Sequence, residues 1–297
     1  MPVPAASSRP FARVLTTLIA AAVLAGVPPA GAQVPTDTVS TPFRPATGTD
    51  ALVLSGGGSR GLAHPGSLLA LEERGYDADI VAGTSVGALV GALYAAGYPA
   101  DEIQRLVRAV RWGELFTAAP SVIGPERAVR YPLVNYDLQT DPLRYPRGFV
   151  PQWRMNRALV QLLFDAESRA RGDFDRLARR FRVVATDLRT GEAVVLARGD
   201  LARAVRASFA VPGVFAPVEW EGRTLIDGGV ADNLPLDAAR QLGARYVVAL
   251  DVGRTDPEIA SRGPISVLGR TIDLFQDLAQ PERTPPDLWI VPELPPA

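Results

Sequence analysis

Short apolar runs alternate with stretches of helical character from about residue 50 to the end of the chain. Apolar runs bounded by turn residues predict buried strands, and they lie here at residues 51–54, 80–82, 181–186, 193–197, 224–226, 246–252 and 288–291. Helices are expected at residues 62–74, 85–96, 101–111, 156–164, 174–180, 201–208, 236–242 and 265–278. This alternation predicts an α/β fold in which a mostly parallel sheet carries helices on both faces.

The first 32 residues have the layout of a secretory signal peptide. Arg9 and Arg13 supply positive charge at the start, and residues 14–27 are apolar. The small residues 30–32 then match a cleavage site. We therefore expect an exported protein, periplasmic, associated with the outer membrane or secreted, whose mature chain begins near Gln33. An uncleaved membrane anchor is the alternative.

The rest of the chain reads as one folded domain after a short lead-in. Residues 33–49 are rich in Pro and Thr and predict a flexible segment. Neither an internal repeat nor a clear linker divides residues 50–297, where we expect a single domain. Within it, residues 98–152 begin with a helix and become rich in Pro, Tyr and Arg. A connection of that length predicts either an insertion that covers a site or a long surface loop.

Composition excludes several classes of function. The formal net charge of −1 provides no basic surface for nucleic acid, so we expect no nucleic-acid partner. The absence of cysteine excludes disulfides, thiol catalysis and zinc-thiolate sites, and a single histidine makes a transition-metal site a poor prediction. We therefore expect a fold held by packing, with no metal. The sequence does not indicate an oligomeric state.

Residues 83–87, Gly-Thr-Ser-Val-Gly, follow the strand 80–82 directly and match the GxSxG nucleophile elbow. Such a turn lifts the hydroxyl of its serine, here Ser85, off the sheet, and small flanking residues let the chain fold that tightly. Residues 57–61, Gly-Gly-Ser-Arg-Gly, also match the GxSxG pattern, with Ser59 as its serine. We favour Ser85 because its first glycine ends a strand directly and the helix after it is rich in small residues.

A serine nucleophile needs a base within hydrogen-bond reach. The chain has no lysine and one histidine, His64, which precedes the elbow, so a Ser-Lys pair and a triad in the usual hydrolase order are both excluded. A carboxylate is therefore the expected base. Asp227 is the best candidate because it ends the strand 224–226 and precedes two glycines, and Asp187, after the strand 181–186, is the second. A lone histidine such as His64 is more often structural than a proton carrier.

The stretch Ser-Gly-Gly-Gly-Ser-Arg-Gly after the first strand predicts an oxyanion hole, since consecutive glycines let several backbone N–H groups point into one space. Gly57 and Gly58 are the expected donors, with Arg60 orienting the loop or stabilising charge nearby. A tight turn without a ligand is one alternative. The glycines also satisfy GxGxxG, the dinucleotide fingerprint. That fingerprint needs an acidic residue at the end of the second strand, and Asp77 and Asp79 lie ahead of that strand.

Tryptophans and an arginine-rich stretch are further candidates for contact with lipid. The tryptophans fit either core packing, which we favour, or a lipid interface: they are Trp112, Trp153, Trp220 and Trp289. Residues 169–182 predict a solvated helix face, with membrane contact as the alternative. Exposure in the folded protein separates these roles.

Three motifs, in order along the chain and each at a predicted strand end, resemble those of the patatin-like phospholipase family. Residues 56–61 match its oxyanion motif, residues 83–87 its nucleophile elbow and residues 227–229 its catalytic aspartate motif. Residues 207–215 also resemble a segment of that family, and the similarity extends over about residues 50–252. The resemblance implies a three-layer α/β fold with a mostly parallel central sheet.

The resemblance also implies a serine acyl hydrolase that cleaves acyl esters of lipids, of the phospholipase A or lysophospholipase type, with no metal or organic cofactor. Its expected partner is a phospholipid or another acyl lipid at a membrane surface. The site residues that the resemblance implies are Ser85 as nucleophile, Asp227 as base, and Gly56, Gly57, Gly58 and Arg60 as oxyanion loop. Two alternatives stay open: a lipid-binding protein with negligible turnover, and a dinucleotide-binding enzyme.

Overall fold

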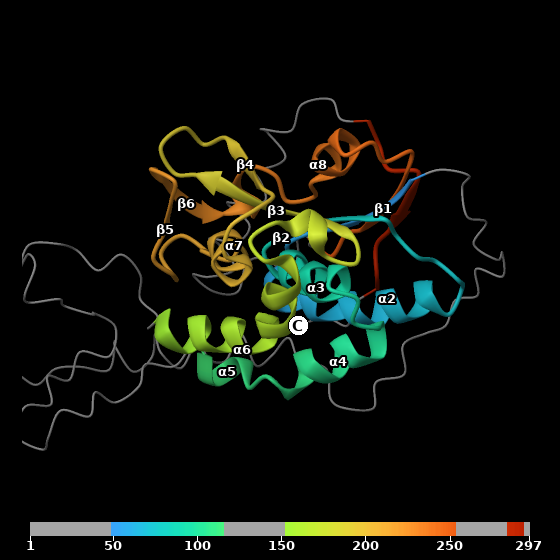
Figure 1. The fold of residues 1–297 in the computed structure, drawn as a ribbon, viewed down its shortest axis with the longest axis horizontal. Helices are drawn as coiled ribbons and strands as arrows, with labels where there is room; N and C mark the ends of the chain where they lie inside the picture. The colour runs from blue at the N-terminus through green and yellow to red at the C-terminus, as the bar shows by residue number, and fades with distance from the viewer. Residues whose placement is uncertain (1–48, 116–151, 254–283, 294–297) are drawn as a thin grey trace, which may run out of the picture.

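The computed structural model describes residues 49–115, 152–253 and 284–293, which form helices on a central sheet (Figure 1). The elements in chain order are β1 (Asp50–Leu54), η1 (Gly58–Ala63), α2 (His64–Glu72), β2 (Ile80–Thr84), α3 (Val86–Ala95), α4 (Ala100–Ala109), α5 (Trp112–Leu115), α6 (Gln152–Ala170), η2 (Phe174–Arg176), β3 (Arg180–Asp187), β4 (Ala193–Leu196), α7 (Leu201–Ser208), β5 (Val218–Trp220), β6 (Arg223–Asp227), η3 (Gly228–Val230), α8 (Leu236–Gln241), β7 (Tyr246–Leu250) and β8 (Leu288–Ile290).

The eight strands of the described residues form one sheet. Their order is β5-β6-β3-β2-β1-β7-β8, with β4 paired to β3 outside this path. From β3 to β8 the neighbours run parallel, whereas β4, β5 and β6 pair antiparallel. The expected mostly parallel central sheet is confirmed.

Alternating side chains divide the core into two layers, one on each face of the sheet. Leu52 and Leu54 pack into the layer that holds α3, α6 and α7, whereas Ala51 and Val53 pack into the layer that holds α8. Figure 1 shows α8 on one side of the sheet and α2, α3, α4 and α6 on the other. Every residue of α3 is buried, because this helix lies between the sheet and the outer helices. The three-layer arrangement follows from this period-two pattern.

The edges of β3 bring two distant strand ends together. β3 pairs with β2 through residues 180–184 and with β6 through residues 185–187. β4 pairs with residues 183–186 and so overlaps both stretches. Because a strand has only two edges, β2 and β6 share the edge opposite β4 and meet there end to end. Thr84, the last residue of β2, pairs with Val184, and Asp227, the last residue of β6, pairs with the next residue of β3.

The helix expected at residues 174–180 is wrong. Only Phe174–Arg176 form a single 3₁₀ turn, η2, and Arg180 already belongs to β3. The carboxylate of Asp173 accepts a hydrogen bond from the backbone N–H of Asp175 at 3.0 Å, which caps the turn. Leu177 then takes an extended conformation that ends it.

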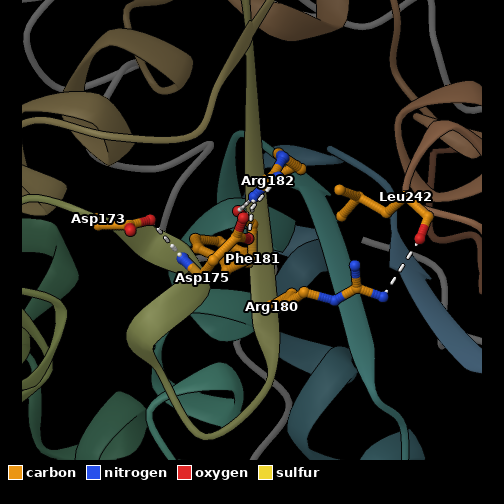
Figure 2. A network of polar contacts seen from close by, with 6 residues as sticks. All are labelled: Asp173, Asp175, Arg180, Phe181, Arg182 and Leu242. Carbon is orange, nitrogen blue, oxygen red and sulfur yellow. Dashed lines mark hydrogen bonds and ion pairs between the residues drawn. The ribbon is translucent and has the colours of Figure 1, made fainter.

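Two arginines of β3, Arg180 and Arg182, form hydrogen bonds with other segments of the chain (Figure 2). Arg182 donates to the two carboxylate oxygens of Asp175 at 2.6 and 3.1 Å, and Arg180 donates to the carbonyl oxygen of Leu242 at 3.2 Å. Residues 169–182 are therefore not one solvated helix face. α6 ends at Ala170, and Arg182 is buried within the sheet.

Two other elements differ from the expectation. β5 was not expected because it is only three residues long; it forms a hairpin with β6, and Glu221 and Gly222 make the turn with positive φ angles of 46° and 80°. The helix expected from residue 62 begins at His64, after the 3₁₀ turn η1, because Pro65 favours the first turn of an α-helix.

Several predictions fall outside the described residues. These include the signal peptide at residues 1–32, nearly all of the lead-in, the helix at 265–278 and most of the segment 98–152. Of that segment, α4, α5 and the first residue of α6 are described. In the described ranges, no helix combines the length and the hydropathy needed to cross a bilayer.

Candidate active site

Ser85 lies in a strained turn between β2 and α3. Its φ and ψ angles are 54° and −121°, a conformation that non-glycine residues rarely adopt. A Cβ on Gly87 would lie 2.4 Å from the carbonyl oxygen of Leu54, and one on Gly83 would lie 2.5 Å from the carbonyl oxygen of Gly87. Only glycines let the backbone pack this tightly beneath the serine, as the elbow motif predicts.

The structure brings Ser85 and Asp227 together. The Ser85 hydroxyl donates a hydrogen bond to Asp227 Oδ2 at 2.9 Å. The other carboxylate oxygen, Oδ1, accepts from the backbone N–H of Gly229 at 2.8 Å, which fixes the plane of the carboxylate. Both side chains are buried. This geometry permits direct proton transfer from the hydroxyl to the carboxylate.

Burial raises the pKa of Asp227 to about 6, against the lowering effect of the hydrogen bonds from Gly229 and Ser85. A carboxylate with this pKa is still mainly ionised at neutral pH. It is also a stronger base than an exposed aspartate, whose pKa is about 4. The position of Asp227 therefore provides a group suited to accept a proton near neutral pH.

Close packing at the end of β6 sets the position of Asp227. A Cβ on Gly228 would lie 2.1 Å from the carbonyl oxygen of Val184, so the chain passes against β3 without room for a side chain. The hydroxyl of Thr186 donates to the carbonyl oxygen of Asp227 at 2.8 Å and accepts from the N–H of Ala231 at 3.1 Å. Together these contacts hold the turn that follows the carboxylate.

The glycine loop after β1 passes beside the nucleophile. A Cβ on Gly56 would lie 3.3 Å from Ser85 Cβ, and the Gly56 N–H donates to the carbonyl oxygen of Asn233 at 3.1 Å. Gly56 therefore permits close approach, but its N–H already has a partner. Among the described residues, the N–H groups of Gly57 and Gly58 have none. Both N–H groups are therefore available to an anion.

Arg60 ties the glycine loop to the end of β7. Its Nη2 donates to the carbonyl oxygen of Gly253 at 2.8 Å. A Cβ on Gly57 would lie 2.8 Å from Val252 Cγ2, so the loop also packs against this same segment. Of the two roles considered for Arg60, these contacts agree with orienting the loop.

Ser208, which the sequence interpretation did not single out, holds the backbone of the nucleophile. Its hydroxyl accepts a hydrogen bond from the Ser85 N–H at 2.8 Å and donates to the carbonyl oxygen of Val184 at 2.5 Å. Ser208 is fully buried at the end of α7. The signal that could have found it is its place in the segment 207–215, which was noted without a role.

Residues 232 and 233 connect the nucleophile to the glycine loop. The hydroxyl of Thr84 donates to the carbonyl oxygen of Asp232 at 2.8 Å. The side-chain amide of Asn233 donates to the carbonyl oxygen of Gly56 at 3.4 Å. The segment after Asp227 thus contacts both of the other motifs, which no local pattern indicated.

Other candidate residues lie apart from this pair. His64 Nε2 donates to the carbonyl oxygen of Ser55 at 2.8 Å, and burial lowers the pKa of His64 to about 4, so the ring is neutral and supports the end of β1. Asp187, the second candidate base, accepts from the N–H of Arg189 at 2.9 Å. Ser85 therefore has its carboxylate contact with Asp227 and not with Asp187.

The acidic residues considered for ribose binding are engaged elsewhere. Asp77 forms an ion pair with Arg179 at 2.6 Å, and Asp79 accepts from the N–H of Asp50 at 3.1 Å, at the opposite end of β1 from the glycine loop. They cannot serve a dinucleotide bound at that loop. Within the described ranges, no group of three His, Cys, Asp or Glu side chains is placed to hold a metal ion.

Comparison with known proteins shows which family this chain resembles. A family model described as patatin-like phospholipase matches residues 52–240. Mouse patatin-like phospholipase domain-containing protein 6 is 36% identical over 210 residues, covering 70% of this chain and 14% of that protein. Lysophospholipase NTE1 of Meyerozyma guilliermondii is 30% identical over 205 residues, which are 69% of this chain and 13% of that protein.

Further similarities are found among bacterial proteins. An uncharacterized NTE family protein of Mycobacterium tuberculosis is 34% identical over 206 residues, or 69% of this chain and 49% of that protein. The chain therefore spans half or less of the curated relatives described here. Among solved structures, VipD from Legionella pneumophila aligns with a TM-score of 0.46 and 18% identity over 76% of this chain and 53% of that one.

Proposed function

Because the chain belongs to the patatin-like phospholipase family, we propose that it is a serine acyl hydrolase that cleaves acyl esters of lipids through a Ser85–Asp227 dyad. The observation that carries this proposal is the 2.9 Å hydrogen bond from the Ser85 hydroxyl to the Asp227 carboxylate. Among the described residues the only imidazole is that of His64, which forms a hydrogen bond with the carbonyl oxygen of Ser55. The base in contact with the nucleophile is therefore the Asp227 carboxylate.

In the first half of the reaction, Asp227 accepts the hydroxyl proton as Ser85 Oγ attacks the ester carbonyl carbon. The carbonyl oxygen becomes an oxyanion, for which the N–H groups of Gly57 and Gly58 are the proposed donors. When the tetrahedral intermediate collapses, the alcohol part of the lipid leaves with the proton held by Asp227. The acyl group remains on Ser85 as an ester.

In the second half, water attacks the acyl-enzyme and gives a proton to Asp227. The fatty acid then leaves, and Asp227 returns the proton to Ser85. The raised pKa of Asp227 supports both directions of transfer, because a group with a pKa near the working pH is able to take and give a proton readily.

The proposed substrates are phospholipids or lysophospholipids presented at a membrane surface. The support comes from the family description and from relatives whose names include phospholipase and lysophospholipase. The proposed location is outside the cytoplasm, periplasmic, at the outer membrane or secreted. Its support is the charge and hydropathy pattern of the first 32 residues.

A fluorophosphonate probe, which reacts with activated serines, tests the proposal. Wild type should be labelled and should hydrolyse a soluble short-chain ester and a lysophospholipid. Ser85→Ala should lose labelling and lower the rate by about 10⁴-fold or more. Ser59→Ala should still be labelled, because Ser59 belongs to the glycine loop and not to the nucleophile elbow. Absence of label on a folded wild-type protein would instead indicate a lipid-binding protein.

A further inference from the structure

Exposed apolar side chains gather on α6. Seven large apolar side chains of the described residues are exposed, and three of them lie on this helix. The exposed fractions are 55% for Trp153, 53% for Val160 and 68% for Phe164. Three large exposed apolar side chains on one helix are a stronger signal than single exposed residues.

These side chains share one face of the helix. Trp153, Arg157, Val160 and Phe164 follow one another at intervals of four, three and four residues, the spacing that keeps side chains on one side of an α-helix. The buried side of α6 consists of Met155, Leu159, Leu163, Ala166 and Ala170. We call the exposed set Trp153, Arg157, Val160 and Phe164 the α6 face.

The part of α6 that carries the α6 face is positively charged. Between residues 152 and 164 the charged residues are Arg154 and Arg157, and the first acidic residue of the helix is Asp165. The guanidinium of Arg154 lies 5.2 Å from the centre of the Trp153 ring. Tryptophan and arginine together suit the boundary between lipid head groups and acyl chains. The apolar part of the indole ring contacts the acyl chains there, while its N–H and the guanidinium group contact the hydrated head groups.

Two contacts near the C-terminal end of α6 orient the helix. Glu167 accepts a hydrogen bond at 2.5 Å from the N–H of Leu201, the first residue of α7. Arg169 donates to the carbonyl oxygen of Ala96, which follows the end of α3. The C-terminal part of α6 therefore lies at the start of α7 and at the end of α3.

Ser85 lies at the other end of both of these helices. It directly precedes α3, and it contacts Ser208, the last residue of α7. The buried side of α6 packs into the core from Met155 to Ala170 and lies against α7. Because Glu167 contacts the first residue of α7, α6 runs back from there along α7 toward the end that holds Ser208 and Ser85. Figure 1 shows α6 on the outer side of the helical layer, away from the sheet.

We propose that the α6 face is the surface by which this protein binds an anionic lipid bilayer, with its apolar side chains entering the interface and its arginine contacting phosphate groups. The partner is inferred from three features together: apolar exposure, positive charge and a position at the Ser85 end of the molecule. The inference rests on the proposed function, because a surface that binds the bilayer brings the nucleophile of a lipid hydrolase to its ester substrates.

Binding to vesicles tests the inference without relying on turnover. The full chain is sedimented with phosphatidylcholine vesicles that either contain or lack phosphatidylglycerol. Replacing Trp153 and Phe164 together by Ser should weaken binding to the anionic vesicles by about 10-fold or more. Arg157→Gln should weaken it by about fivefold on anionic vesicles and hardly at all on neutral ones. Leu188→Ser, which removes a side chain that is 53% exposed on a different surface, is the matched control and should bind as wild type does.

A soluble short-chain ester separates this inference from the proposed function. All three variants should hydrolyse it within about twofold of wild type, because the α6 face does not contact the dyad. The inference is wrong if wild type hydrolyses the ester but does not bind vesicles, or if the α6 variants bind vesicles as well as wild type does. In both cases the proposed function is retained. If vesicle binding depends on the α6 face but no ester is hydrolysed, the membrane-binding inference is supported and the proposed function is wrong. Conversion of a dimer to a monomer by the double variant, with no change in vesicle binding, would show that a second copy covers this face and would overturn the inference.

Discussion

The hydroxyl of Ser208 accepts a hydrogen bond from the backbone N–H of Ser85 at a distance of 2.8 Å. The same hydroxyl donates to the carbonyl oxygen of Val184 at 2.5 Å, so it links the nucleophile's backbone to the central strand β3. Ser85 has a φ angle of 54°, which is unfavourable for a residue with a side chain. Ser208 therefore helps to hold the conformation that directs the Ser85 hydroxyl toward Asp227.

Ser208→Ala should lower kcat by about 10- to 100-fold and change KM by less than about twofold. The Ser85 N–H would lose its partner and the hydroxyl its alignment, and small misplacements of a reacting group are costly. Steady-state kinetics on a soluble ester, far below the melting temperature, measure both constants. Ser168→Ala, on the exposed side of α6, is the control. A drop in apparent kcat no larger than the fraction of unfolded protein, measured by circular dichroism on the same sample, would point to a purely structural role.

The pH profile of kcat/KM should have an acidic limb near pH 6. Burial raises the pKa of Asp227 to about 6, and the protonated carboxyl is unable to accept the Ser85 proton, so activity should fall as pH drops through this value. His64→Gln should leave the limb in place, because burial lowers the pKa of His64 to about 4 and its ring bonds to Ser55. A limb that disappears in this variant would contradict the assignment of the base.

Asp227→Asn should abolish activity and yet stabilise the fold at neutral pH. Because the pKa of this carboxyl is higher in the folded protein than in the unfolded chain, the unfolded chain loses the proton first, and stability falls as pH rises from about 4 to about 6. The amide has no charge to bury, so the variant should gain about 1–3 kcal/mol above pH 6 and nothing below pH 4. Urea unfolding at pH 4 and pH 8 measures the difference. Equal stability of the two proteins at pH 8 would contradict the burial argument.

Gly228→Ala should disrupt the site. Its Cβ would lie 2.1 Å from the carbonyl oxygen of Val184, and because that oxygen belongs to a central strand, the turn carrying Asp227 must move instead. We expect a loss of about 1–3 kcal/mol in the free energy of unfolding and a large loss of fluorophosphonate labelling. Gly66→Ala is the matched control: Gly66 is exposed on α2, its added Cβ would have no neighbour closer than 4.0 Å, and alanine should stabilise the helix by about 0.5–1 kcal/mol. Retained labelling in Gly228→Ala would show that the turn tolerates displacement.

Much of the fold was predictable from the chain itself, because the signals for it are local. The strand at residues 51–54 and the helix at 201–208 are marked by short apolar runs and by periodicity, and both are present in the structure. The helix expected at residues 174–180 failed because side-chain contacts of Asp173 and Asp175 made a single turn followed by a strand. Core packing, favoured for the tryptophans, holds for Trp220, which is buried, but not for Trp153 and Trp289, which are exposed.

By itself the sequence determined the three glycine-containing turns, the identity of the nucleophilic serine candidate and the absence of lysine as a base, since each depends on residue type and local spacing. Only the tertiary structure decided that Asp227 rather than Asp187 contacts Ser85, across 142 residues of chain. The reason is the sheet: β2 and β6 meet end to end on one edge of β3, and strand pairing between distant segments leaves no local mark in the sequence. The raised pKa of Asp227 and the contact of Ser208 with the Ser85 backbone also arise only when these segments are buried together.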